Sequence, residues 1–463
     1  EYTIQVPDPS TTVLVFSFVG YLTQEISISD QTTIDIAMEP DIYGVEEVVV
    51  IGYGTQKKVN LTGSVSAIEG DQLAKQPVFQ SSQALVGLAP GLTAIQSSSQ
   101  PGKDAATLRI RGIGSLTASN NPLVLIDGIE GDINGVDAND IESISVLKDA
   151  SASSIYGSRA SNGVILVTTN RAKSGELSVN YRNWFGWQKA TETPQYLGAL
   201  DFMKYSGYDQ AVIDDYAANL GDPDRYPDTD WYAEQITESG FQQYHQISLN
   251  GGTENVRTLA SFSYMDQGAN VVNFNYKRYN GRFNTDIKFS DKFDMNFDVS
   301  FRRSITKEPS IGLTWIFQAI SRIPPIYTAR YSDGSWGEGW DGNNPIAFAN
   351  DGGIRESHSN YFVGRLKANY SPIPGLKFSI MYAPEYSDGY LKRFARTYEA
   401  ILDWDTKITK TVPDRNSLYQ RNNSAFTGNF NALATFEKSF SGHNVTVLAG
   451  YELIQFQSNY FTA

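Results

Sequence analysis

From Glu176 to the end of the chain, apolar and polar residues alternate with a period of two. That spacing gives a β-strand one apolar face and one polar face. We expect Phe297 and Phe430 on the apolar face, and Asp298 and Asn429 on the polar face. We expect about nine such strands in this part of the chain. The clearest runs are Tyr279–Phe289, Met295–Arg302, Phe362–Tyr370 and Phe426–Glu437.

The connections between these runs alternate in length. The short ones are 250–255, 290–292, 371–375 and 439–443, and the long ones are 189–242, 267–275, 307–357 and 388–423. Transmembrane β-barrels have short turns on one side and longer loops on the other, with strands of roughly ten residues. A soluble β-sandwich has no reason to sort its loops by length in this way. The pattern therefore predicts a transmembrane barrel. Because large barrels with a filled lumen have about 22 strands, we expect the chain to be the N-terminal part of a longer protein.

The segment Ile141–Asn170, before the alternating region, has a different pattern. Residues 163–169 are apolar at both odd and even positions, which is typical of a strand buried on both faces. Small residues fill Ser151–Tyr156 and predict a short helical turn. A short helix start is expected at Ile141, with Asn139 or Asp140 as the cap of its first turn. The segment holds no obvious nucleophile, general base or metal ligand. It indicates an α/β unit with a mechanical role.

This segment resembles the end of the plug domain of TonB-dependent outer-membrane transporters of the SusC/RagA family. Three further motifs upstream follow the same family order, namely Leu85–Leu92, Leu108–Gly112 and Pro122–Gly128. The resemblance implies a mainly β protein, with an α/β plug domain over residues 59–172 and the first strands of a large antiparallel transmembrane β-barrel over residues 173–463.

The first 58 residues precede the plug and fall into two parts. Residues 1–40 resemble the end of the Ig-like, carboxypeptidase-regulatory-like domain of this family, which carries no peptidase residues. Strands are expected there at Val13–Phe16, Gln24–Ser27 and Thr33–Met38. Residues 41–58 are expected to form a linker that contains a TonB box.

The proposed TonB box is a short β-prone run between acidic residues and glycines. It could be an ordinary edge strand of the first domain, or a strand kept free to join a partner's sheet. We favour the second interpretation because the run lies directly before the plug motifs. Its residues are Glu47, Val48, Val49, Val50, Ile51, Gly52, Tyr53 and Gly54.

Composition excludes several classes of function. The net charge of −14 and the absence of a basic cluster argue against nucleic acid as a partner. The chain has no cysteine, its three histidines are widely spaced, and the acidic segment 127–142 lacks EF-hand spacing, so we predict no metal site. No apolar run is long enough for a transmembrane helix, which needs about 18 residues. We identify no catalytic residue, expect no cofactor, and predict that the protein is not an enzyme.

Arg109 and Arg111 lie on one strand of the expected plug. In an enzyme they could bind an anionic substrate. Inside a polar barrel, a confined arginine is expected to pair with a carboxylate. We therefore predict that both residues contact acidic side chains of the barrel wall.

Tryptophans in the long loops are candidate recognition residues. Trp336 and Trp340 lie among Gly, Asp and Asn, and Trp231 lies in the first long loop. Such side chains suit a sugar or other ligand, a partner protein that covers the barrel, or packing within the loop itself. The sequence leaves these three possibilities open.

The resemblance implies TonB-dependent active import of a nutrient across the bacterial outer membrane. It also implies TonB with ExbB and ExbD as the energy source, a SusD-like surface lipoprotein as a lid, and surrounding outer-membrane lipid. The nutrient that we expect is an oligosaccharide, with peptides as the alternative. A passive barrel or surface adhesin would explain the strands but not the plug. A soluble glycan-acting enzyme would need a pair of catalytic carboxylates that the sequence does not indicate.

Overall fold

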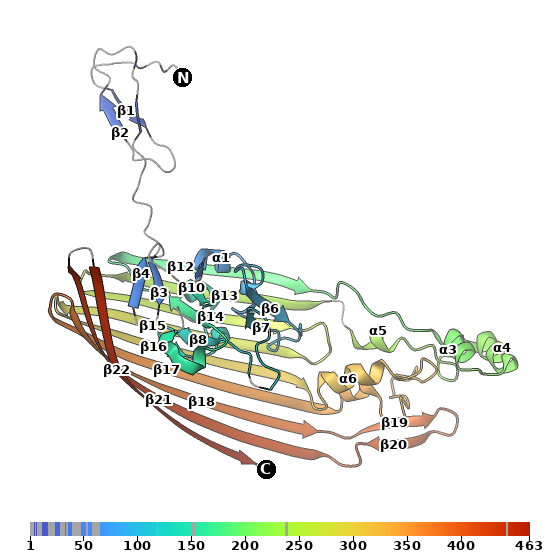
Figure 1. Ribbon diagram of the computed structural model, residues 1–463. Coiled ribbons are helices and arrows are strands. Elements are labelled where there is room, and N and C mark those ends of the chain that lie inside the picture. Colours follow the sequence, from blue (N-terminus) through green and yellow to red (C-terminus); the bar gives the residue numbers. More distant parts are fainter. Residues whose placement is uncertain are drawn as a thin grey trace.

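The computed structural model describes most of the chain after residue 64. A curved antiparallel sheet forms a wall, and the plug lies against its concave face (Figure 1). The described residues are 4, 6, 12–16, 24–27, 33, 36–38, 48–51, 54–57, 65–117, 119–149, 154–236, 239–440 and 443–463.

The wall is a sheet of nine strands within the described residues, and neighbours in the sheet follow one another along the chain except where a small hairpin intervenes after β18. Its strands form wherever the period of two was found, so the predicted antiparallel sheet is confirmed. The strands are β12 (Gly175–Gln188), β13 (Gly240–Gly252), β14 (Val256–Gly268), β15 (Asn275–Ser290), β16 (Phe293–Pro309), β17 (Gly353–Ile373), β18 (Leu376–Ala395), β21 (Ser417–Phe440) and β22 (His443–Thr462).

The two faces of the wall differ as the alternation predicts. Phe297 is 42% exposed on the convex face, whereas its neighbour Asp298 is 6% exposed on the concave face beneath the plug. Asn429 is buried and Phe430 is half-buried. Large apolar side chains therefore cover the outside of the wall, and polar side chains meet the plug.

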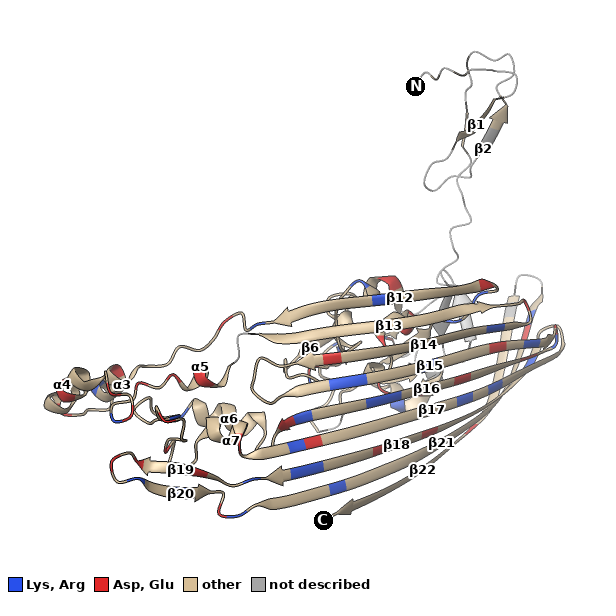
Figure 2. Cartoon of the chain, turned by 180° about the vertical axis from the view of Figure 1, so that it is seen from behind, with Lys and Arg blue, Asp and Glu red and all other residues tan. Residues whose placement is uncertain are grey.

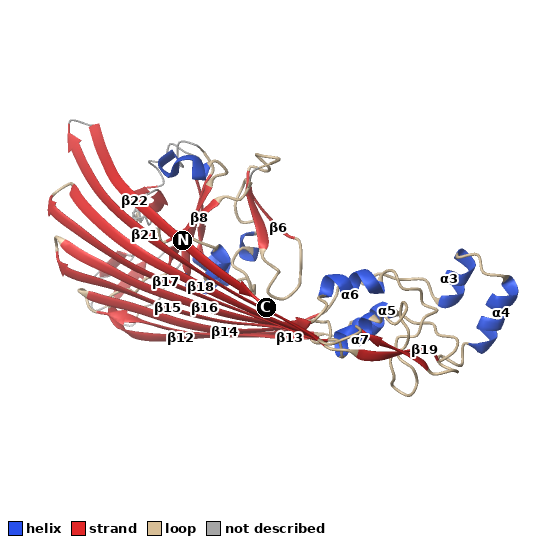
Figure 3. Ribbon diagram, turned by 90° about the horizontal axis from the view of Figure 1, so that it is seen from below, coloured by secondary structure: helices blue, strands red, loops and turns tan. Residues whose placement is uncertain are grey.

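The long connections gather at one end of the wall and the short turns at the other (Figure 3). We call the long-connection end the long-loop lobe. Four wall strands, β16, β17, β18 and β21, extend further into this lobe than the alternation indicates. Hydrogen bonding between neighbouring strands continues there after the apolar face of each strand ends. No helix in the described part of the chain is long and apolar enough to cross a membrane. The elements of the lobe are α3 (Ala199–Tyr205), α4 (Gln210–Asn219), α5 (Trp231–Gln235), α6 (Leu313–Ile320), α7 (Pro345–Asn350), β19 (Tyr398–Asp403) and β20 (Ile408–Val412).

The plug is built on a five-stranded sheet in the order β5–β10–β11–β8–β9. Its central strand, β11, is parallel to β8 and antiparallel to β10. Residues Val164–Val167 of β11 are at most 4% exposed, which confirms a strand buried on both faces. The strands are β5 (Val65–Glu69), β8 (Leu123–Ile126), β9 (Ile129–Glu130), β10 (Ile141–Leu147) and β11 (Val164–Thr169).

Short elements complete the plug. These are α1 (Gly70–Ala74), η2 (Gln83–Leu85), β6 (Leu92–Gln96), β7 (Ala106–Ile110), η3 (Ile133–Gly135), η4 (Ala138–Asp140) and η5 (Ser154–Ala160). The prediction of a helix start at Ile141 capped by Asn139 or Asp140 was wrong, because Ile141 begins strand β10 and the helical turn η4 lies before it. Asp137 caps η4 by accepting a hydrogen bond from the Asn139 backbone N–H, whereas the Asp140 carboxylate is turned toward the wall.

Before the plug, β1 (Val13–Phe16) pairs with β2 (Gln24–Ser27), as expected. Of the expected strand Thr33–Met38, residues 33 and 36–38 are described and do not form a strand, and the others lie outside the described residues. Further along, β3 (Val48–Ile51) pairs with β4 (Gly54–Lys57). The division of the chain at residues 40, 58 and 172 stays a prediction.

Candidate functional site

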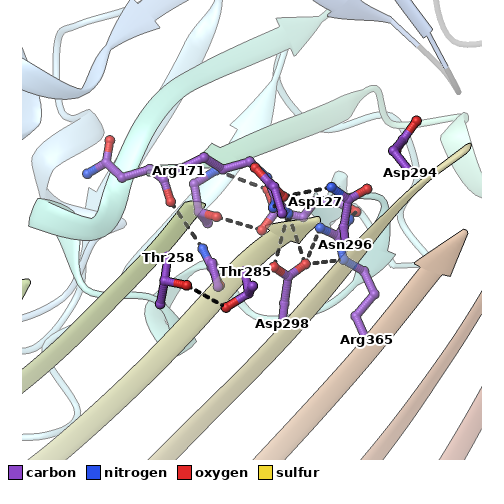
Figure 4. A network of polar contacts seen from close by, with 12 residues as sticks. Asp127, Arg171, Thr258, Thr285, Asp294, Asn296, Asp298 and Arg365 are labelled. Atoms are coloured by element: carbon purple, nitrogen blue, oxygen red, sulfur yellow. Dashed lines mark hydrogen bonds and ion pairs between the residues drawn. The ribbon is translucent and has the colours of Figure 1, made fainter. Parts of the chain in front are cut away.

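The contact between plug and wall is the candidate site. Arg171 follows strand β11 and extends from the plug to the wall (Figure 4). Its Nη2 donates to Asp298 Oδ2 at 2.9 Å, and its Nη1 contacts the carboxylate of Asp286. Both acids lie on the concave face of the wall strands. One plug guanidinium therefore joins two neighbouring wall strands, β15 and β16.

Charges from plug and wall alternate around Asp298. Arg365 of β17 donates from Nε to Asp298 Oδ2 at 2.6 Å and from Nη1 to the Asp127 backbone carbonyl at 2.6 Å. Asp127 belongs to the plug turn after β8, where its φ of 49° lies in the left-handed region. The strands of the wall that carry these charges are seen from outside in Figure 2. Each buried charge in this cluster therefore has a partner of opposite sign.

The Asp127 carboxylate is held from both sides. It accepts from the Thr169 backbone N–H at 3.0 Å within the plug, and from Arg282 Nη2 of the wall at 2.6 Å. Burial raises the pKa of this carboxyl, but the guanidiniums of Arg282 and Arg365 outweigh burial and hold the pKa at about 2. Asp127 is therefore charged at any physiological pH.

A second region of the plug–wall contact is formed by hydrogen bonds from uncharged side chains. Asp137 accepts from Tyr244 Oη and Ser263 Oγ, each at 2.8 Å. Asp140 accepts from Gln246 Nε2 and Ser261 Oγ, each at 2.9 Å. All four donors lie on wall strands β13 and β14. Two buried plug carboxylates are thus bound by neutral wall groups, and they repel one another.

Burial, together with that repulsion, makes the charge of Asp140 sensitive to pH. Burial, followed by the neighbouring Asp137 carboxylate, raises the pKa of Asp140 from 3.8 to about 7. A plug separated from the wall would lose the proton near the ordinary pKa. Between about pH 4 and pH 7 the docked plug binds more protons than the separated plug does. The free energy of docking should therefore become less favourable as the pH rises through this range, and it should stay constant above about pH 7.

Replacing Asp140 with Asn should flatten this pH dependence, because the amide is neutral throughout. The measurement is protease sensitivity of the plug against pH. A matched control is Asp132→Asn, since Asp132 is an exposed plug acid whose Oδ2 lies 3.7 Å from Arg302 Nη1. A profile that keeps the same slope in the Asp140 variant would contradict the assignment.

The rest of the interface is also polar. Asp104 of the plug accepts from Gln267 Nε2 at 3.1 Å, and Asn284 Nδ2 of the wall donates to the Asn170 carbonyl at 3.0 Å. Open cavities of about 370 and 550 Å³ lie between plug and wall. Strands β16, β17, β18 and β21 line the first, and β12 to β14 line the second. A polar, partly open contact can separate without exposing a large apolar surface to water.

The prediction that Arg109 and Arg111 pair with the wall was wrong. Arg109 donates to the Leu108 carbonyl and to Asn121 Oδ1, and Arg111 pairs with Asp149. All of these partners belong to the plug. The side chains reach neighbouring plug loops first, so Arg171 makes the expected contact with wall carboxylates instead.

The tryptophans separate into two groups. Trp231 is 3% exposed and donates to the Pro324 carbonyl, and Trp336 is 8% exposed and donates to Asp351 Oδ2 at 2.8 Å. Both belong to the core of the long-loop lobe, so of the three possibilities the structure favours internal packing for these two residues. Trp340 is 58% exposed and stays a candidate for recognition.

The expectation of an unpaired strand in the proposed TonB box was also wrong. Val48–Ile51 pairs with Gly54–Lys57 as β3 and β4, although the other edge of β3 is unpaired within the described residues. Residues 47, 52 and 53 of the box lie outside the described residues. Among the described residues, no group of three or more His, Cys, Asp or Glu side chains could hold a metal ion.

Comparison with known proteins gives one consistent result. Residues 57–164 match the TonB-dependent Receptor Plug Domain family. TonB-dependent receptor P26 of Formosa agariphila is 36% identical over 85% of this chain and 40% of that protein. TonB-dependent receptor SusC of Bacteroides thetaiotaomicron is 30% identical over 97% of this chain and 46% of that protein. The chain therefore spans less than half the length of these curated relatives.

A solved structure shares the fold. The RagAB peptide importer in its open-open state superposes with a TM-score of 0.74 and 24% identity, covering 90% of this chain and 50% of that one. Because the match covers 90% of this chain, it has to include residues of both the wall and the plug. The plug match and the curated relatives place this chain in the TonB-dependent receptor family, in the SusC/RagA type.

Proposed function

We propose that this protein imports a nutrient actively across the bacterial outer membrane, with the plug as the gate of the barrel. The polar plug–wall contact carries the proposal. Ion pairs and hydrogen bonds hold the plug in place, yet water can take over each of these partners as the plug moves. A passive barrel or an adhesin has no need of a plug held in this manner.

The energy source that we propose is TonB, acting with ExbB and ExbD. An extended segment of TonB could pair with the open edge of β3, since strand addition uses only backbone groups. The pairing of β3 with β4 then has to persist beside the new strand or give way to it. Force on this linker would be transmitted to the plug that follows it in sequence.

The nutrient that we propose is an oligosaccharide, delivered with a SusD-like surface lipoprotein as lid. An exposed tryptophan in the long-loop lobe supports a ligand with flat apolar faces. Peptides are the second candidate, because the structurally similar RagAB is a peptide importer. The likeness to RagAB is one of fold, so it leaves the oligosaccharide as our first choice.

Deleting Val48–Gly52 should abolish uptake while leaving folding and ligand binding unchanged. The segment is separate from the ion pairs between plug and wall, so its loss removes the site of TonB pairing alone. The measurement is uptake of labelled oligosaccharide by intact cells, compared with ligand binding to the purified receptor.

Deleting Gln24–Glu25 in the earlier strand β2 provides the control, because it also shortens the region before the plug but spares the proposed box. Uptake at the wild-type rate without Val48–Gly52 would overturn the role of this segment. Uptake that continues after a protonophore dissipates the energy source would overturn active import itself.

A further inference from the structure

An open pocket in the long-loop lobe lies outside the plug–wall contact. It is formed between helix α6, with the residues directly after it, and the loop that follows Gly339. Its volume of about 490 Å³ is within the range of about 300–1,000 Å³ that is common for ligand sites. The residues that give it chemical character are Trp315, Gln318, Arg322, Ile323, Trp340 and Asn343.

The aromatic wall of this pocket is exposed but held in place. Trp340 is 58% exposed, and its backbone N–H and carbonyl both bond to Asn343, at 3.4 and 2.9 Å. Lys410 Nζ donates to Asp341 Oδ2 at 2.7 Å and ties the same loop to strand β20. Gly342 permits the tight turn with a φ of 83°. The indole is therefore presented to solvent by an ordered loop.

The opposite wall is equally well supported. Helix α6 buries Ile316 and Ile320 in the core of the lobe. Trp315 is partly buried against the same core, and Gln318 is exposed. Trp315 packs edge-on against Phe348 of α7, with ring centroids 5.1 Å apart. The two aromatic walls thus require little reorganisation before a ligand enters, and preorganisation favours binding.

The polar side chains of the pocket are free to bind a ligand, and the charge among them is positive. The side chains of Gln318, Arg322 and Asn343 are exposed and have no hydrogen-bond partner among the described residues. Arg322 contributes a positive charge, and no aspartate or glutamate lines the pocket, although the chain as a whole has a net charge of −14. A guanidinium in this setting suits a carboxylate or sulfate, which it can bind with two parallel hydrogen bonds.

We propose that this pocket binds an acidic sugar ring, a pyranose that bears a carboxylate or a sulfate group. The apolar face of the ring lies on the Trp340 indole, the anionic group pairs with Arg322, and ring hydroxyls bond to Gln318 and Asn343. The inference rests on the proposed import function and specifies its substrate class. An acidic peptide shares the charge but lacks the rigid apolar ring face that the fixed indole matches.

The test measures binding of oligosaccharides to the receptor purified in detergent. The probes are an alginate hexamer with carboxylates, a carrageenan hexamer with sulfates, uncharged maltohexaose and a hexapeptide of alternating Glu and Ala. A glycan array of neutral and acidic oligosaccharides extends the panel. We expect an acidic oligosaccharide to bind, and the comparison of the first two probes separates a carboxylate from a sulfate ligand.

Two variants and two matched controls locate the binding. Arg322→Gln and Trp340→Ala should each weaken binding of the acidic oligosaccharide by about tenfold or more, the loss expected for a charge-assisted hydrogen bond or an aromatic contact. Arg396→Gln removes an exposed charge near the same end of the wall, and Tyr205→Ala removes an aromatic side chain that is 83% exposed on α3. These controls should change affinity less than twofold.

Four results would overturn the inference. They are selective binding of neutral oligosaccharides, binding of the acidic peptide through Arg322, binding of no acidic oligosaccharide on the array, and unchanged affinity in both pocket variants. Energy-dependent uptake of a neutral oligosaccharide would contradict the acidic ligand and leave the import proposal intact. Uptake that needs no energy source would instead contradict the import proposal.

Discussion

Replacing Asp298 with Asn should loosen the plug by about 3–5 kcal/mol, the loss expected when one partner of a buried ion pair is removed. Asp298 is 6% exposed and accepts hydrogen bonds from Arg171 of the plug and Arg365 of the wall. The amide keeps the volume of the side chain but leaves both guanidiniums without their shared countercharge. Thermal unfolding of the purified receptor, combined with limited proteolysis of the plug, measures the effect.

Asp294→Asn is the matched control on the same strand and the same face. Asp294 accepts from Asn369 Nδ2 of the wall at 2.7 Å and forms no ion pair with the plug among the described contacts. Its substitution should leave plug proteolysis close to wild type. Equal plug release in the two variants would show that Arg171 does not depend on the Asp298 charge.

Arginine at Ile247 should reduce the amount of folded barrel far more than arginine at Ser248. Ile247 is 45% exposed on the convex face of β13, where the proposed membrane would surround it, and a midplane arginine costs about 2–4 kcal/mol there. Ser248 is its direct neighbour and faces a polar cavity that Glu69 and Glu142 also line. The fraction of protein that migrates as a heat-modifiable folded barrel on a gel measures the difference.

This neighbouring pair is a better test than arginine at Phe297 and Asp298. Both pairs place one residue outside and one inside, but Asp298 already holds two guanidiniums and a third would add repulsion to the measurement. Equal losses from Ile247→Arg and Ser248→Arg would contradict the assignment of the convex face to lipid. A larger loss from Ser248→Arg would reverse it.

The strands and their facing follow from the sequence because both are local properties. Successive side chains of an extended chain point to opposite sides, so the alternation around Phe297 and Asn429 determines which residues meet the plug. The buried strand β11 and the order of the plug motifs are likewise visible in short segments. Strand ends were less predictable, since hydrogen bonding in β17 and β18 continues where the alternation fades.

The partners of individual side chains were decided by tertiary structure. Arg109, Arg111 and Arg171 all lie on the plug, yet only the last of these reaches the wall carboxylates, because the loops around the other two supply nearer acceptors. In the same way, Trp336 and Trp340 stand four residues apart in similar sequence, but one is enclosed by the core of the lobe and the other is presented to solvent. Residue type and spacing determine what a side chain is able to do, whereas the packing of distant segments determines which group it meets.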